Sequence, residues 1–277
     1  MTPGRVSPGR VLIVAGSDSG GGAGIQADIK AVTALGGYAM TAITALTAQN
    51  TEGVFGVHAP PPEFVALQMR LTLQDIGADC VKIGMLHSVG VIEAVAGALA
   101  EYAAGVPVVL DPVMVAKGGA PLLEPDAIDA YRALLPGLAT VITPNLPEAG
   151  VLLGRSLRTA ADQAAATDAA RALGARAVLL KGGHLEGETV RDVLIEPDRT
   201  TVFENPRIET RHTHGTGCTL ASAIAAGVAD GMALDAAVGR AIAYVREAIR
   251  TAPGLGHGHG PLNHGHTVAP YFPGDSG

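Results

Sequence analysis

The chain has 277 residues, a formal net charge of -7 at pH 7, 48% hydrophobic residues and 3% aromatic ones. The acidic balance argues against a nucleic-acid partner or an anionic membrane surface, and the length and apolar content allow a large aliphatic core. Two cysteines, Cys80 and Cys218, make no disulfide framework and fit a reducing, cytoplasmic compartment. No unbroken apolar run of about 18 residues predicts a membrane span, and the polar start lacks the apolar region of a signal peptide.

Short apolar runs alternate with amphipathic segments from the start of the chain. A strand at 11–15, a glycine-rich turn at 16–24 and a helix at 25–35 predict the beginning of a β–α–β unit. The turn is not a Walker loop, because no Lys-Ser/Thr pair follows its glycines, and it lacks the strict dinucleotide fingerprint. Its five glycines in nine residues favour close approach of the backbone to a small ligand over a flexible connection.

The same alternation continues to residue 251 and predicts one α/β domain over residues 1–277. The domain is expected to have three layers, a mostly parallel sheet with helices on both faces, a flexible N-terminus at 1–10 and a His/Gly-rich tail at 256–277. Further strands are predicted at 38–48, 54–57, 80–85, 107–110, 140–143 and 177–181, with an antiparallel pair at 190–195 and 200–203 at the sheet edge. Further helices are predicted at 60–76, 89–103, 125–134, 146–153, 160–173, 219–230 and 235–251, the last covering the one before it.

Polar residues follow several predicted strands at their carboxyl ends, which is the edge where open parallel sheets bind ligands. Each residue alone is typical of a cap or a turn, but their convergence on one edge predicts a site. These residues are Asp18, Gln49, Asp111, Asn145, Glu148, Lys181 and His184.

Residues 211–220 read RHTHGTGCTL, where an irregular segment becomes an Ala-rich helix. Gly215, Thr216 and Gly217 can turn the backbone so that successive N–H groups point the same way, and a helix start adds unpaired donors and a positive dipole end. The segment therefore predicts a phosphate pocket, with Cys218 beside it as a thiol of lowered pKa. The alternative is an ordinary helix start with a small buried cysteine.

These parts together indicate phosphoryl transfer, which needs positioning and charge stabilisation more than covalent chemistry. Asp111 and Glu148 are hard oxygen ligands that could hold Mg²⁺ directly or through water, and Lys181 could meet a phosphate. Cys218 could take the proton of a substrate hydroxyl or only line the pocket.

Histidines suggest two other functions. A Cys–His hydrolase would use Cys218 with His212 or His214 to form an acyl-enzyme, but that interpretation leaves the polar residues after the other strands unexplained. The tail carries four histidines within GHGHGPLNHGH, a pattern that suggests a metal site. Because neither cysteine nor carboxylate joins that cluster, we favour a terminal segment that packs on the body or frays.

Several blocks, in order over nearly the whole chain and including the tail, resemble the bacterial hydroxymethylpyrimidine and phosphomethylpyrimidine kinases. That family has the ribokinase-like fold and serves thiamine biosynthesis. The blocks are AGSDSGGGAGIQAD (15–28), ITALTAQNT (43–51), KIGML (82–86), DPVM (111–114), TPNLPEA (143–149), KGGH (181–184) and THGTGCT (213–219).

The resemblance implies two ATP-dependent steps at one site, from hydroxymethylpyrimidine to its monophosphate and then to the diphosphate, with Mg²⁺ as cofactor. Sugar kinases of this fold carry Asp where Cys218 stands, which points to the pyrimidine branch. A pyridoxal kinase is the nearer rival, because that ring also carries a hydroxymethyl arm. Dimers are common in the fold, so a homodimer is expected.

The resemblance also implies a role for each site residue, with Gln49 reading the aminopyrimidine edge. The resemblance assigns Gly215, Thr216, Gly217 and Cys218 to catalysis, and Gly16, Asp28, Gln49, Met85 and Val113 to the substrate wall. It assigns Asn145, Lys181 and His214 to the ATP side, and Asp111 and Glu148 to the metal.

Overall fold

The computed structural model describes residues 7–115, 119, 122–183, 185 and 187–268. Within these ranges the strands form one nine-stranded sheet in the order β3-β2-β1-β4-β5-β6-β7-β8-β9. The strands are β1 (Arg10–Asp18), β2 (Tyr38–Gln49), β3 (Val54–His58), β4 (Cys80–Ile83), β5 (Val108–Leu110), β6 (Val141–Ile142), β7 (Ala177–Leu180), β8 (Thr189–Ile195) and β9 (Thr200–Pro206).

The sheet is mostly parallel, as predicted. The six strands from β2 through β7 in the sheet order pair in parallel, whereas β3 joins one edge antiparallel and the β8–β9 hairpin extends the other. The order reverses at β1, whose parallel neighbours are β2 on one side and β4 on the other. In open sheets a crevice forms beyond the carboxyl ends of the strands at such a reversal.

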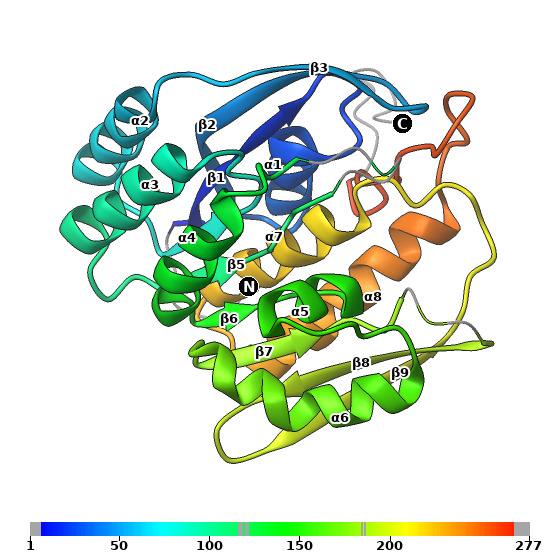
Figure 1. Cartoon of the computed structure of the whole chain (residues 1–277). Coiled ribbons are helices and arrows are strands. Elements are labelled where there is room, and N and C mark those ends of the chain that lie inside the picture. The colour runs from blue at the N-terminus through cyan, green and yellow to red at the C-terminus, as the bar shows by residue number, and fades with distance from the viewer. Residues whose placement is uncertain (1–6, 116–118, 120–121, 184, 186, 269–277) are drawn as a thin grey trace, which may run out of the picture.

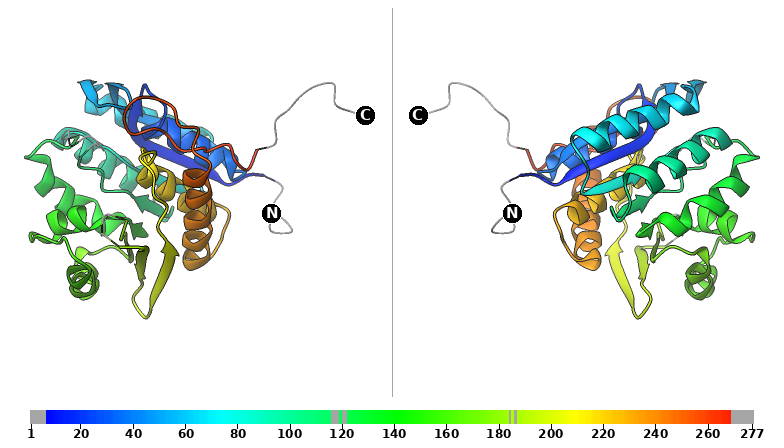
Figure 2. Two further views of the ribbon diagram at one scale, coloured as in Figure 1. Left: turned by 90° about the vertical axis from the view of Figure 1, so that its right-hand side faces the viewer. Right: turned by 90° about the vertical axis from the view of Figure 1, so that its left-hand side faces the viewer.

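Helices cover both faces of the sheet and complete the three predicted layers (Figures 1 and 2). Helices α1, α7 and α8 share one buried aliphatic cluster with the sheet, and α2 through α5 share the other. The helices are α1 (Gly24–Ala34), α2 (Pro62–Asp75), α3 (Val89–Tyr102), α4 (Ala127–Leu134), α5 (Leu146–Leu153), α6 (Ala160–Ala170), α7 (Thr216–Ala229) and α8 (Leu234–Arg250), with 3₁₀ turns at Pro136–Leu138 and Arg171–Leu173. None of the described helices is long and apolar enough to cross a membrane.

Two boundaries differ from the prediction in ways that shape the crevice. Strand β1 runs through the first residues of the glycine-rich turn to Asp18, because β2 continues alongside and pairs Thr47 with Asp18 after an irregularity. Helix α7 begins at Thr216 rather than at 219, because Gly215 takes a φ of 80° and serves as its N-cap. Only a glycine adopts that conformation at little cost.

Described parts of both terminal segments contact the body of the domain. In the N-terminal segment, the Gly9 carbonyl accepts the N–H of Tyr38 and Arg10 begins β1. The tail packs on the body through residue 268, which is the arrangement we favoured. Residues 1–6 and 269–277, as well as His184, lie outside the described part of the chain.

Candidate active site

A cavity of ≈ 760 Å³ opens at the carboxyl ends of the parallel strands, where the sheet order reverses. It is lined by the start of α7, the glycine-rich turn after β1, the end of β2 and the residues that follow β4 through β7. Of the predicted site residues that the structure describes, all except Asp28 line this cavity; His184 lies outside the described residues. The ends of several parallel strands thus bring predicted polar residues to one cavity.

The N-terminus of α7 supplies free hydrogen-bond donors to the cavity. The first bond within the helix runs from the Thr219 N–H to the Gly215 carbonyl at 2.9 Å. Across the described residues, the N–H groups of Gly217 and Cys218 meet no backbone or side-chain acceptor. Such donors at the positive end of a helix bind anions.

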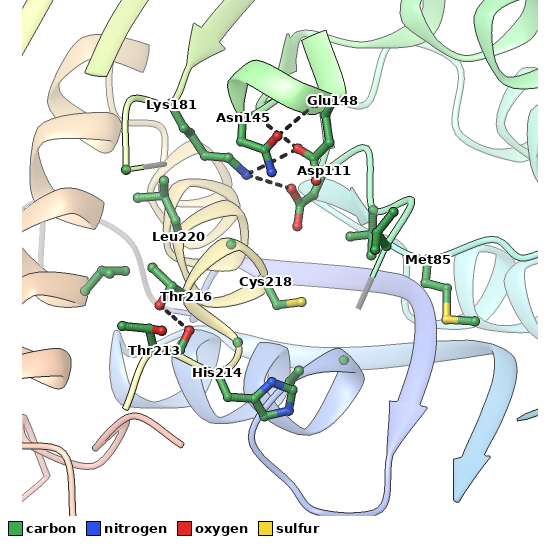
Figure 3. A pocket seen from close by; sticks show the side chains of 18 of the residues that line it. Met85, Asp111, Asn145, Glu148, Lys181, Thr213, His214, Thr216, Cys218 and Leu220 are labelled. Carbon is green, nitrogen blue, oxygen red and sulfur yellow. Dashed lines mark hydrogen bonds and ion pairs between the residues drawn. The ribbon is translucent and has the colours of Figure 1, made fainter. Parts of the chain in front are cut away.

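A cluster of one cation and two carboxylates faces this helix end (Figure 3). Lys181 Nζ lies 3.2 Å from Asp111 Oδ1 and 3.9 Å from Glu148 Oε2. A Cβ added to Gly217 would lie 3.4 Å from the same Nζ and 3.7 Å from Asp111 Oδ2, so the helix start lies directly against this cluster. A phosphoryl group placed here would meet N–H donors and the ammonium together.

Asn145 and Glu148 are held by a capping box at the start of α5. The Asn145 side chain accepts the Glu148 N–H at 2.9 Å, and Glu148 Oε2 accepts the Asn145 N–H at 2.8 Å. The sequence Asn-Leu-Pro-Glu produces this box because its cap and its third helical residue carry matching acceptors. One oxygen of Glu148 is thereby fixed at the cavity wall.

The carboxylates of this cluster are poised for a cation. Desolvation raises the pKa of Glu148 to about 7, with the charge of Asp111 adding to the rise and Lys181 opposing it. Asp111 Oδ2 is buried and has no hydrogen-bond donor among the described residues. A buried carboxylate oxygen without a partner is costly, and a hard cation such as Mg²⁺ fits that oxygen and the adjacent Glu148.

The glycine-rich turn is organised by Asp18, a role that sequence reasoning missed. Its carboxylate accepts the N–H groups of Gly20 at 2.8 Å, Gly22 at 3.0 Å and Ala23 at 2.9 Å. Burial acts to raise the pKa of Asp18, but hydrogen bonds from His214 and from these N–H groups lower it overall. The signal was available, because an Asp before several glycines commonly bonds its own loop.

His214 belongs to the Gln49 side of the cavity, away from the Lys181 cluster that the ATP prediction implied. Its Nε2 lies 2.9 Å from Asp18 Oδ2 and 3.3 Å from Gln49 Nε2. Because ionised Asp18 can only accept, Nε2 carries the hydrogen and cannot also accept from the amide. The Gln49 amide therefore keeps donor capacity for a ligand, while its Oε1 contacts the Thr47 hydroxyl at 3.1 Å.

Cys218 lines the cavity, and Figure 3 shows it below the Asp111 cluster and above His214. The prediction of a lowered thiol pKa is wrong. Desolvation raises the pKa of Cys218 to about 12, and the opposing effect of the Lys82 ammonium does not compensate. Within the described chain Cys218 makes no hydrogen bond to a histidine, and His214 is bonded to Asp18 instead, so the hydrolase arrangement is not formed.

Asp28 does not belong to the substrate wall. It is completely buried, where Lys82 Nζ bonds both of its oxygens at 3.0 and 2.9 Å and Ser222 Oγ donates to Oδ1 at 2.7 Å. This triad joins α1, β4 and α7 beneath the site. The signal was a lysine inside the apolar strand Cys80–Ile83, since a buried charge requires a partner.

Comparisons with known proteins agree with this geometry. The family model described as phosphomethylpyrimidine kinase matches residues 18–263. The hydroxymethylpyrimidine/phosphomethylpyrimidine kinase of Streptomyces coelicolor is 48% identical over 260 residues, which cover 94% of this chain and 96% of the relative. The thiamine biosynthesis bifunctional protein ThiED of Geobacter sulfurreducens is 52% identical over 259 residues, covering 92% of this chain and 52% of the relative.

The chain thus spans about half the length of the Geobacter protein and nearly all of the Streptomyces one. Among solved structures, an ADP complex of Bacillus subtilis pyridoxal kinase matches with a TM-score of 0.85 at 37% identity, covering 94% of this chain and 98% of that one. Fold, cavity and sequence point the same way, and the chain belongs to the phosphomethylpyrimidine kinase family.

Proposed function

We propose that this chain transfers the γ-phosphoryl group of ATP to the hydroxymethyl oxygen of 4-amino-5-hydroxymethyl-2-methylpyrimidine, and then a second phosphoryl group to the product, in thiamine biosynthesis. One observation carries the proposal: Gly217 and Cys218, whose N–H groups are free among the described residues, line the same cavity as Gln49 and the Lys181–Asp111–Glu148 cluster. Figure 3 shows the cluster facing Cys218. Family membership supplies the substrate class.

The α7 start and Lys181 would act on the transferred group. Charge on the phosphoryl oxygens must be stabilised as the bond to the leaving oxygen breaks, and fixed donors do this without reorganisation. The N–H groups of Gly217 and Cys218 are such donors, and Lys181 adds a full positive charge. Gly215, as the N-cap, sets their direction.

Asp111 and Glu148 would hold Mg²⁺, on the grounds that Asp111 Oδ2 has no partner among the described residues and Glu148 is fixed by the capping box. When bound, Mg²⁺ would neutralise charge on the phosphate oxygens. The chain itself keeps both carboxylates beside Lys181. The positive charge of Lys181 limits the repulsion between the two carboxylates when no metal cation is bound.

Gln49 would recognise the pyrimidine. A side-chain amide pairs with an amino group beside a ring nitrogen, because it offers both an acceptor and donors. Met85, Val113 and Gly16 lie on the same cavity and would form the apolar wall around the ring. A Cβ at Gly16 would lie 2.9 Å from the Met85 sulfur, so this glycine makes room for the methionine.

Pyridoxal phosphorylation is the second candidate, favoured by the fold shared with the Bacillus pyridoxal kinase. A coupled assay of ADP formation separates the two when run with hydroxymethylpyrimidine, its monophosphate, pyridoxal, ribose or no acceptor. We expect turnover with the first two acceptors and slower turnover with pyridoxal. Pyridoxal turnover equal to that of the pyrimidine would favour the rival, and equal ADP formation without any acceptor would remove the kinase assignment.

We also infer a homodimer and a cytoplasmic location, which rest on family and composition alone. Sedimentation equilibrium tests the first and cell fractionation the second. A monomer at micromolar concentration, or recovery outside the cytoplasm, would overturn them.

A further inference from the structure

The C-terminal strap, defined as residues 256–266, contacts three segments that also carry cavity-lining residues. At the end of β2, the Gly258 and His259 N–H groups bond Thr51 Oγ1 at 3.2 Å and the Thr51 carbonyl at 2.9 Å. Before α7, the His214 N–H donates to the Gly260 carbonyl at 3.1 Å. In the glycine-rich turn, a Cβ on Gly22 would touch the strap's proline at 3.1 Å.

The strap ends in a buried hydrogen-bond chain that reaches the N-cap of α7. His264 is 5% exposed, and its Nε2 lies 2.9 Å from Thr219 Oγ1. The Thr219 hydroxyl in turn donates to the Gly215 carbonyl at 2.8 Å. The backbone of His264 is itself fixed, because the Tyr244 hydroxyl donates to its carbonyl at 2.6 Å.

The direction of these bonds follows from what each atom can do. The Gly215 carbonyl only accepts, so the single hydroxyl hydrogen of Thr219 goes to it, and His264 Nε2 must be the donor. Desolvation lowers the pKa of His264 to about 4, so the ring is neutral near pH 7 and has a single N–H. Donation by the Thr219 hydroxyl to the Gly215 carbonyl assigns that hydrogen to Nε2. The Gly215 carbonyl thus receives both the hydroxyl and the N–H of Thr219.

We propose that His264 is a positioning residue of the phosphoryl-transfer site, which acts through Thr219 to fix the Gly215 peptide and with it the N–H groups at the start of α7. Because a peptide unit is planar, fixing its carbonyl also fixes the N–H of Thr216, the first residue of α7, and the N–H groups of Gly217 and Cys218 follow from it in the same helical turn. The inference rests on the proposed kinase function. It gives one of the four histidines of the tail a role in orienting the site.

Steady-state kinetics of His264→Leu test the proposal. We expect kcat with hydroxymethylpyrimidine to fall by about 10–100-fold, since small misplacements in such sites have effects of this order, with KM for the pyrimidine changed less than about twofold. His264→Gln, whose amide can donate from a similar reach, should restore kcat to within about fivefold of the parent. His257→Leu, at an exposed position of the same strap, is the matched control and should leave kcat unchanged.

A second variant tests the proposal even if His264→Leu does not fold. Thr219→Val keeps the shape of a buried side chain and removes only the hydroxyl. If His264 acts through Thr219, the double variant should lose no more kcat than the worse single variant, because the two form one chain. Additive losses, or a failure of His264→Gln to rescue kcat in a folded protein, would overturn the proposal.

The kinase assignment and this inference fail in different ways. If the parent protein forms no ADP in response to any acceptor, the proposed function is wrong. If the parent is active and His264→Leu matches His257→Leu in kcat, only the positioning role is wrong.

Discussion

Several opposing effects act on the pKa of the Cys218 thiol. The helix start and the nearby Lys82 ammonium favour the thiolate, whereas desolvation and the carboxylates of Asp28 and Asp111 oppose it. Desolvation is the largest of these, so the thiol stays protonated near pH 7. The backbone N–H of this residue, which needs no ionisation, is therefore its main contribution to the site.

This distinction predicts the outcome of Cys218→Ala. The variant keeps the N–H and loses only the thiol, so we expect kcat within about tenfold of the parent. A general base would instead account for about 10²–10⁴-fold. Steady-state kinetics with both phosphoryl acceptors check this, and a loss in the larger range with unchanged KM would make the thiol the base after all.

Gln49→Leu tests recognition of the ring. The leucine has similar bulk but leaves the polar edge of the pyrimidine without a partner, at a cost of about 1–3 kcal/mol. We expect KM for hydroxymethylpyrimidine to rise roughly 10–100-fold while KM for ATP stays nearly constant. Equal changes in both constants, or in neither, would mean that Gln49 does not contact the ring.

Glu148 should make the response to Mg²⁺ depend on pH. With a pKa of about 7, its carboxyl is protonated below that pH and becomes a ligand as the pH rises. The Mg²⁺ concentration for half activity should therefore fall between about pH 6 and about pH 8. In Glu148→Gln it should be higher and independent of pH in this range, while the exposed Glu63→Gln behaves as the parent. An unchanged Mg²⁺ response would leave Glu148 with the capping role alone.

At the scale of elements, the start of α7 and the glycine-rich turn are fitted to each other. Gly215 has a φ of 80°, and a Cβ there would lie 1.9 Å from the Gly22 carbonyl oxygen. Two backbone segments can approach this closely only where neither carries a side chain. The anion pocket therefore depends on contact between two loops that belong to different parts of the sequence.

Gly215→Ala should damage this contact as well as the backbone conformation. Gly231 is a matched control, because its φ is 78° but a Cβ there meets nothing within 4 Å. Gly231→Ala should lower the free energy of unfolding by about 1–2 kcal/mol, the cost of a left-handed residue. Gly215→Ala should lower it further and abolish most activity. Equal losses in chemical denaturation would show that the contact with Gly22 contributes nothing.

Local sequence signals were sufficient for the elements and for the sheet edge where the site lies. Strand and helix periods, prolines at helix starts and the Asn145–Glu148 capping box are all encoded within a few residues. Asp28, His214 and His264 could not be placed in this way, because their partners lie on other elements. The predicted pKa shift of Cys218 was wrong for the same reason, because desolvation depends on which residues the whole fold packs around the thiol.

At the scale of the whole molecule, the Lys82–Asp28 ion pair links the central sheet to helices on one face. Both side chains are fully buried, so removing one partner leaves an uncompensated charge in the core. Lys82→Met should lower the free energy of unfolding by about 3–5 kcal/mol. The double change Lys82→Met with Asp28→Leu should lose less than the single one, because no lone charge remains. Denaturant titrations of both variants check this, and a double variant as damaged as the single would contradict it.

The hydrogen bond between Asp18 and His214 spans 196 positions of sequence, and the bond between Thr219 and His264 adds a later segment. The ribosome synthesises β1 and the glycine-rich turn early, whereas His214 and His264 are synthesised much later. The full set of hydrogen bonds around the glycine-rich turn and the start of α7 is therefore available only after residue 264 has been synthesised.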